Sequence, residues 1–203
     1  MIVRDEHGII CQGDANDPSY KDGGDSASRT GIMSLNSLLD SSLLPLFITE
    51  TNELVRHPTQ KKWNDPKETS RDQLVAYFVS IRNSAVAHKY AKQWFINKDF
   101  LSPIVKLHFY KASGFSAPIW LKVLGKIEMA LAMYWNTKIK PDEEMNQFTC
   151  VCIRLGYARE LFVKHPNLVK NIREYFSGWR DQREIGEALI SEVMKSIVAS
   201  ANK

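Results

Sequence analysis

The sequence predicts an all-α protein of seven or eight helices, packed as antiparallel hairpins behind an irregular N-terminal segment. Three observations favour this fold class. Apolar residues recur at helical spacing over most of the chain after residue 25, strands and helices do not alternate, and no repeat of fixed period can be aligned. With 203 residues, of which 44% are hydrophobic and 25% charged, the composition is that of a globular domain. We therefore expect one domain spanning residues 1–203, with residues 1–24 irregular and residues 25–203 forming the helical body.

The first 67 residues combine turns, one helix and a long connection. Glycine and proline interrupt residues 1–24, which predicts turns and a short hairpin across Glu6–Gly8. Asp25 or Ser26 can cap a helix that runs to Leu39. Residues 40–67 contain three prolines, and connections of this length are often functional. Any strand is expected only in residues 1–24 or in this connection.

The rest of the chain shows helical periodicity almost throughout. Ser70 and Gln73 form an S-x-x-Q capping box before the second helix. The strongest helical pattern covers residues 118–135, and Pro141 suits the first turn of the helix that follows. After the helix that starts near Ser70, the expected helices cover residues 84–96, 100–111, 118–135, 141–155, 166–177 and 183–200.

Charge and hydropathy restrict the partners and the compartment. The net charge is +4, although residues 1–30 hold six acidic and only three basic groups. A mildly basic body permits contact with acidic glycans, but it lacks the dense basic stripe of a nucleic-acid interface, so a nucleic-acid-associated protein is only the third and weakest hypothesis. No apolar run is long enough to span a bilayer, and the first residues lack the apolar core of a signal peptide. We expect a cytoplasmic protein, or a virion protein if the chain comes from a phage.

The sequence gives no reason to expect a cofactor or a bound metal. The common phosphate-binding, dinucleotide-binding, zinc-peptidase and serine-hydrolase motifs do not occur. Three cysteines and no signal peptide indicate reduced thiols. Cys150 and Cys152 would point in different directions on a helix, so we interpret them as buried apolar residues without zinc. The acidic residues 14–25 do not match an EF-hand, and another oxygen-rich cation site there stays open.

Two polar clusters, each leading into a predicted helix N-terminus, form the candidate site. The first is G-D-S-A-S-R-T-G at residues 24–31. The second combines R-H-P at 56–58, W-N-D-P at 63–66 and S-R-D-Q at 70–73. A helix N-terminus favours an ionised carboxylate. We predict that Asp25 and Asp72 form a catalytic pair on one rim of the bundle. The alternative is that each carboxylate serves only the start of its own helix. The residues expected to bind substrate beside the pair are Arg29, Arg56, His57, Trp63 and Arg71.

Paired carboxylates with arginines and an aromatic platform suit chemistry on sugars. Hydrolysis of a glycosidic bond needs two carboxyl groups at a defined separation. The sequence therefore predicts a glycosidase-like protein that acts on a glycan or another polar small molecule. The alternative is a non-enzymatic phage protein with a protein partner, either a virion component or an inhibitor of a host factor. A concave site joining the two clusters would favour the first hypothesis, and an exposed apolar patch would favour the virion component.

The motifs of the two clusters carry a resemblance. The order G-D-S-A-x-R-T-G, R-H-P, W-N-D-P and S-R-D-Q resembles that of a group of uncharacterised phage and bacterial helical proteins, mainly over residues 23–75. No activity is established for that group, so the resemblance implies no catalytic residue. Polar loops that lead into helix N-termini are also similar to those of helical-toroid enzymes acting on glycans, in which one rim forms the site. This chain is too short for a full toroid, and the likeness is one of architecture.

Overall fold

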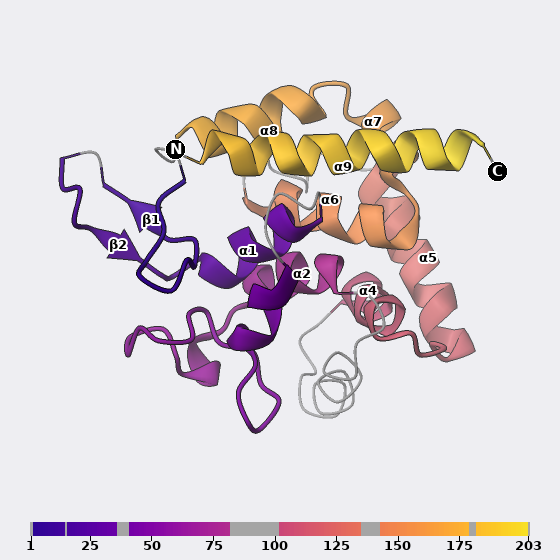
Figure 1. Cartoon of the computed structure of the whole chain (residues 1–203). Helices are drawn as coiled ribbons and strands as arrows, with labels where there is room; N and C mark the ends of the chain where they lie inside the picture. The colour runs from indigo at the N-terminus through magenta and orange to yellow at the C-terminus, as the bar shows by residue number, and fades with distance from the viewer. Residues whose placement is uncertain are drawn as a thin grey trace.

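The computed structural model describes residues 2–14, 16–35, 41–81, 102–134, 143–178 and 182–202. In these residues the chain is mainly helical, with one two-stranded antiparallel sheet near the N-terminus, which confirms the predicted fold class (Figure 1). The strands are β1 (Gln12–Gly13) and β2 (Lys21–Asp22). The α-helices are α1 (Ser26–Ser34), α2 (Arg71–Ser80), α4 (Pro103–Ser113), α5 (Ile119–Tyr134), α6 (Glu143–Leu155), α7 (Ala158–Lys164), α8 (Leu168–Ser177) and α9 (Arg183–Ala201). Two 3₁₀ helices, η1 (Ser41–Phe47) and η2 (Pro66–Glu68), lie in the connection between α1 and α2.

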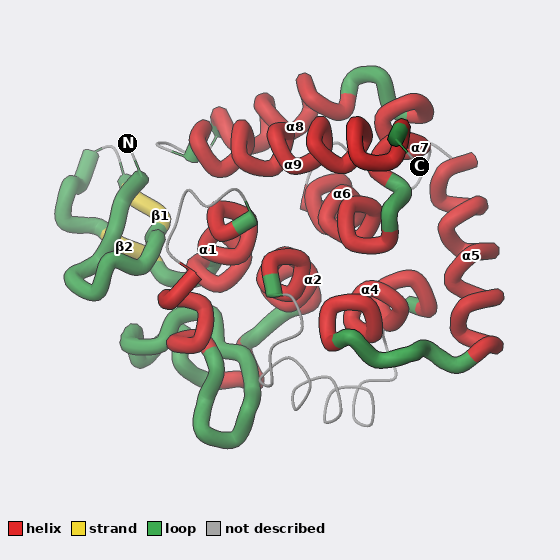
Figure 2. Tube along the Cα trace, turned by 45° about the vertical axis from the view of Figure 1, so that its right-hand side comes forward, coloured by secondary structure: helices red, strands yellow, loops and turns green. Residues whose placement is uncertain are grey.

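Helix α2 lies at the centre of the molecule and contacts α1, α4 and α6 (Figure 2). Every residue from Gln73 to Val79 is buried, so this helix has no solvent-facing stripe, as expected for a central helix. Its C-terminal carbonyl groups find a partner in another helix, because the guanidinium of Arg154 in α6 donates to the carbonyls of Phe78, Val79 and Ile81.

A glycine sets the distance between α1 and α2. A Cβ atom added at Gly31 would lie 2.5 Å from the carbonyl oxygen of Ala76 and 2.6 Å from the Cα of Tyr77. Both atoms belong to the backbone of α2, so the two helices approach each other as closely as they do only because residue 31 has no side chain. This contact brings the start of α1 beside the start of α2, and with it Asp25 beside Asp72.

The N-terminal segment is part of the core rather than a loose extension of it. The predicted hairpin is present, since Arg4 and Ile10 form an antiparallel bridge and Gly8 turns the chain with a φ of +78°. Ile9, Ile10 and Cys11 are fully buried. The side chain of Gln182, at the start of α9, donates to the carbonyl of Cys11 and so links the two ends of the chain.

Several local predictions need correction. Ser70 is the N-cap of α2, but its side chain makes no capping bond, and Gln73 turns to other partners, so the predicted capping box is wrong. Helix α7 was not predicted from the sequence. Gly156, at a φ of +86°, ends α6 and lets the chain start this new helix two residues later. The predicted helix 84–96 lies outside the described residues, as do Pro141 and the last part of the helix predicted to end at Leu39.

Helix α5 confirms the predicted helix at 118–135 but buries a narrow face. Leu121, Gly125, Met129 and Met133 pack inward, next to α4 and α7. The larger apolar side chains on the other face, including Trp120 and Ile127, are exposed.

The late cysteines lie in the core, as predicted. Cys150 and Cys152 are both fully buried in α6. Burial raises the pKa of the Cys150 thiol to about 12 and raises that of Cys152 as well, so both are protonated thiols.

In the described part of the chain, no helix is both long and apolar enough to cross a membrane.

Candidate functional site

The two predicted carboxylates share one small pocket at the junction of α1, α2, α6 and α8. Asp25 lies at the start of α1 and Asp72 in the first turn of α2. Arg29 lines the same pocket, one turn after Asp25. Its walls consist of Asp25, Ser28, Arg29, Ile32, Asp72, Ala76, Asn146, Gln147, Cys150, Tyr175 and Phe176. Asp25 and Asp72 are 47 positions apart in the sequence. They lie in one pocket, with Arg29, because α1 packs closely on α2 at Gly31.

One side-chain amide joins the two carboxylates. The Nε2 atom of Gln73 donates to Asp25 Oδ1 at 3.0 Å and to Asp72 Oδ2 at 3.1 Å. The Oε1 atom of the same side chain accepts from the backbone N–H of Ser28 at 3.0 Å. Gln73 is fully buried, so it fixes the spacing of the two carboxylates and occupies the point between these two oxygens.

Arg29 supplies the positive charge of the pocket. Its Nη2 atom lies 3.1 Å from Asp25 Oδ2, in an ion pair whose arginine side chain is only 6% exposed. Burial lowers the pKa of the Arg29 guanidinium from its ordinary value, and the neighbouring carboxylate of Asp25 acts in the opposite direction. A buried guanidinium needs such a partner, so Asp25 is bound to Arg29 and Gln73 at once.

Helix α6 contributes two amides to the opposite wall. Asn146 is 7% exposed, lines the pocket, and its Nδ2 atom has no hydrogen-bond partner among the described residues. Gln147 accepts a hydrogen bond from the Nε of Arg71 at 3.1 Å, which places Arg71 at the rim. A buried N–H group without a partner is costly, and such groups are satisfied by an ordered water or by a polar atom of a bound molecule.

The pocket is small. Its free volume of about 40 Å³ accommodates one or two waters or the end of a ligand, whereas pockets that enclose a whole drug-sized ligand measure roughly 300–1,000 Å³. A whole sugar ring therefore does not fit inside, although one polar edge of a larger molecule does.

Arg56 and Trp63 do not line this pocket. Arg56 donates to the carbonyls of Gly24 and Glu68 and to the hydroxyl of Ser70, which ties the second cluster to the start of α1. Trp63 lies 5.3 Å from the Arg56 guanidinium and donates from Nε1 to Asp22. The contacts of both side chains are therefore with neighbouring loops, and their predicted role in binding substrate stays a prediction.

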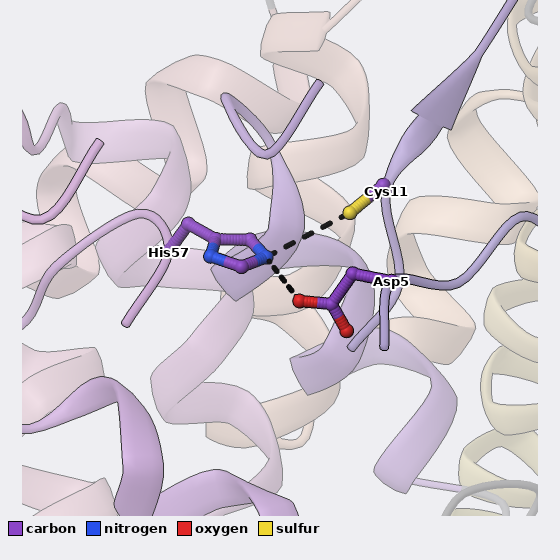
Figure 3. Close-up of side chains that lie close together, drawn as sticks. All are labelled: Asp5, Cys11 and His57. Atoms are coloured by element: carbon purple, nitrogen blue, oxygen red, sulfur yellow. Dashed lines mark hydrogen bonds and ion pairs between the residues drawn. The ribbon is translucent and has the colours of Figure 1, made fainter. Parts of the chain in front are cut away.

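His57 does not line this pocket either, and no part of its side chain is exposed. It is fully buried, and its Nε2 atom lies 3.2 Å from Asp5 Oδ2 and 3.7 Å from Cys11 Sγ (Figure 3). Sequence reasoning missed this cluster, because its three residues come from segments without a shared motif. A Cβ atom at Gly23 would lie 2.5 Å from the His57 ring, so the glycine makes room for it.

The ligand atoms of Asp5, Cys11 and His57 lie within 4.8 Å of one another, the spacing of a metal site. The hydrogen bonds of the ring argue against that use. The Nδ1 atom accepts from the backbone N–H groups of Thr59 and Gln60, at 3.3 and 3.2 Å, so the proton of the neutral ring is on Nε2. A metal ligand needs a lone pair at that atom.

The same cluster does not have the arrangement of a nucleophilic cysteine. Burial raises the pKa of the Cys11 thiol to about 11, with the carboxylate of Asp5 as the second cause. Burial also lowers the pKa of His57, so the ring is neutral and Nε2 already carries its proton. A general base would need a free lone pair facing the thiol. The cluster therefore joins the N-terminal hairpin to the 57–63 loop.

Comparison with known proteins returned no match: no protein-family model, curated protein or solved structure is significantly similar to this chain. The resemblance to phage and bacterial helical proteins stays a prediction from the motifs of residues 23–75.

Proposed function

We propose that this protein binds a hydroxyl-rich polar ligand, one edge of which enters the pocket between α1, α2, α6 and α8. The observation that carries the proposal is the meeting of Asp25 and Asp72 with a buried amide donor, Asn146 Nδ2, that has no partner among the described residues.

The donors and acceptors of the pocket match hydroxyl groups. Ionised carboxylates only accept hydrogen bonds, while the Asn146 amide nitrogen only donates them. A hydroxyl group does both, so neighbouring hydroxyls of one ligand can donate to the carboxylates on one wall and accept from Asn146 on the other. Ile32 and Phe176 supply apolar surface for the C–H groups of the same ligand.

Binding is favoured over hydrolysis by the position of Gln73. In a glycosidase the scissile bond lies between the two carboxyl groups. Here the Gln73 amide lies between Asp25 Oδ1 and Asp72 Oδ2, and the pocket volume leaves no room for a sugar ring across them. Glycosidase-like action would require that side chain to move. The alternative of a non-enzymatic phage protein stays a prediction from the sequence.

A ligand screen with matched variants tests the proposal. Ligand-observed NMR on the full chain, with a panel of monosaccharides, polyols and short glycans, should detect binding. Asn146→Leu keeps the approximate shape of the side chain but removes the donor. We expect it to weaken binding at least about tenfold and, since it removes an unsatisfied buried group, to raise the unfolding free energy by about 1 kcal/mol.

A carboxylate variant and its control complete the design. Asp72→Asn should also weaken binding, whereas Asp65→Asn should not, because Asp65 caps η2 away from the pocket. Arg29 keeps its partner Asp25 in all three variants. No binding by the wild type to any member of the panel, or equal binding by Asn146→Leu and the wild type, would refute the proposal.

A further inference from the structure

The outward face of α5 carries large apolar side chains that remain exposed. Their exposed fractions range from 45% to 79%. The helix lies at the edge of the molecule in both views (Figures 1 and 2). The residues of this face are Ile119, Trp120, Val123, Leu124, Ile127, Leu131 and Tyr134.

This face is unusual because α5 is apolar on both sides. Leu121, Met129 and Met133 already supply the inward stripe that a peripheral helix needs. A helix that is apolar nearly all round is normally buried, and soluble monomers rarely expose large contiguous apolar patches. The composition of α5 is therefore that of a helix covered on its outer side by another molecule.

A groove between α5 and α7 adjoins this face. It has a volume of about 460 Å³, and Met129, Met133, Tyr157 and Val163 provide much of its lining. Methionine adapts its shape to different neighbours and is common on protein-binding surfaces. A recess of this size and chemistry accepts apolar side chains projecting from a partner helix.

The charges that line the groove are mostly positive, and Glu128 of α5 already accepts a hydrogen bond from the backbone N–H of Ile104. Lys126, Arg159 and Lys164 line the groove, with Glu160 as its acidic residue, and Lys122 lies one turn before Lys126. Within the described part of the chain, none of these four cations pairs with a carboxylate. Unpaired cations around an apolar surface favour a partner with carboxylates in the matching places.

We propose that α5 and the α5–α7 groove dock an amphipathic helix of a partner protein, apolar on the contact face and acidic along its edges. A second copy of the chain fits less well, because an identical surface offers the same cations, Lys122 and Lys126, and not the carboxylates that they lack. A lipid surface also fits less well, because a flat membrane leaves the recess between α5 and α7 unfilled.

Two synthetic peptides of about 18 residues test the proposal on the full chain. Both carry leucine at i, i+3, i+4 and i+7 spacing, and one has glutamate where the other has lysine on the flanking positions. We expect the acidic peptide to bind at least about tenfold more tightly than the basic one and to weaken with added salt. Trp120, which is 59% exposed, should report binding by a blue shift in emission that Trp120→Phe removes.

Matched variants locate the site. Ile127→Ser combined with Leu131→Ser should weaken binding of the acidic peptide at least about tenfold, and Lys126→Glu with Lys164→Glu should reverse the preference between the peptides. Val198→Ser removes an apolar residue from α9 that is 60% exposed, and Lys67→Glu reverses a charge on η2, so neither should change binding. Circular dichroism checks that each variant is folded.

Several results would overturn the proposal. They are equal binding of both peptides, no effect of the α5 variants, self-association of the wild type that those variants abolish while neither peptide binds, and binding to anionic lipid vesicles without binding to the acidic peptide.

Discussion

At the level of single residues, burial keeps His108 neutral. The side chain is completely buried in α4, and its Nε2 atom lies 3.1 Å from the carbonyl oxygen of Val75 in α2. Burial, and secondarily the charge of Arg154, lowers the pKa of His108 from 6.5 to about 3. The neutral ring donates to Val75 and so links two core helices without bringing a charge into the core.

The lowered pKa of His108 implies that the stability of the protein depends on pH. Between about pH 6.5 and about pH 3, the unfolded chain protonates His108 and the folded protein does not, so the free energy of unfolding falls as pH falls through this window. The slope from this residue is about 1.4 kcal/mol per pH unit. His108→Gln keeps a donor toward Val75 but does not titrate. Urea unfolding measured from pH 7 to pH 4 gives the unfolding free energy at each pH. This free energy should fall less steeply with falling pH for His108→Gln than for the wild type.

The control for this experiment is His7→Gln, because His7 lies exposed in the N-terminal hairpin. Its slope should match that of the wild type. If His108→Gln shows the same dependence on pH as the wild type, the ring must accept a proton in the folded protein, and the assignment of a neutral buried histidine fails.

At the level of elements, the contact between α1 and α2 controls the pocket. Asp25 and Asp72 each belong to a different helix, and neither helix alone positions a site. The close backbone approach at Gly31 and the bridging amide of Gln73 set the spacing of the two carboxylates. The pocket therefore depends on helix packing as much as on its polar residues.

Gly31→Ala should separate α1 from α2, because the added Cβ atom would meet backbone atoms of α2 that cannot turn away. We expect a loss of roughly 1–3 kcal/mol in unfolding free energy, the usual cost of overpacking, together with weaker ligand binding in the pocket. Denaturant unfolding followed by circular dichroism measures the first effect.

Gly178→Ala is the matched control for this glycine. Gly178 has a helical backbone conformation, and an added Cβ atom would meet only ordinary contacts, at 3.5 Å or more. This variant should change the unfolding free energy by less than about 1 kcal/mol. Equal effects of the two substitutions would contradict the close packing of α1 on α2.

At the level of the whole molecule, the N-terminal segment and the helical body form one core. Ile9 and Ile10 pack in the same apolar cluster as α2, α8 and α9. The buried cluster of Asp5, Cys11 and His57 and the bond from Gln182 to Cys11 add polar links between distant parts of the sequence.

Ile10→Ala should therefore destabilise the entire protein. We expect a loss of about 2–5 kcal/mol, as for a large apolar residue deep in a core, with all the helical signal still lost in one transition. Val198→Ala, at a position that is 60% exposed in α9, should change stability by less than about 0.5 kcal/mol. A separate, early transition confined to the N-terminal segment would mean that it folds apart from the body.

Local periodicity by itself determined that this chain is helical and where most of its helices lie. Glycine, proline and apolar spacing act over a few residues, so they are readable without knowledge of the fold. The same local signals predicted that Asp25 and Asp72 each lie at a helix start, where the structure has them. Gly156 offered a local signal for the break before α7 as well.

Only the tertiary structure decided which partners the polar groups have and which faces are covered. Gln73 could cap its own helix, yet it bridges two carboxylates, because α1 packs close enough to offer it better partners. The sequence predicted that His57 binds substrate, but its side chain lies in the core because the N-terminal hairpin folds over it. On α5 both faces are apolar, so periodicity could not choose between them, and packing against α4 and α7 buried the narrower one. Hydrogen bonds and burial depend on residues far apart in the chain, and no local pattern records those contacts.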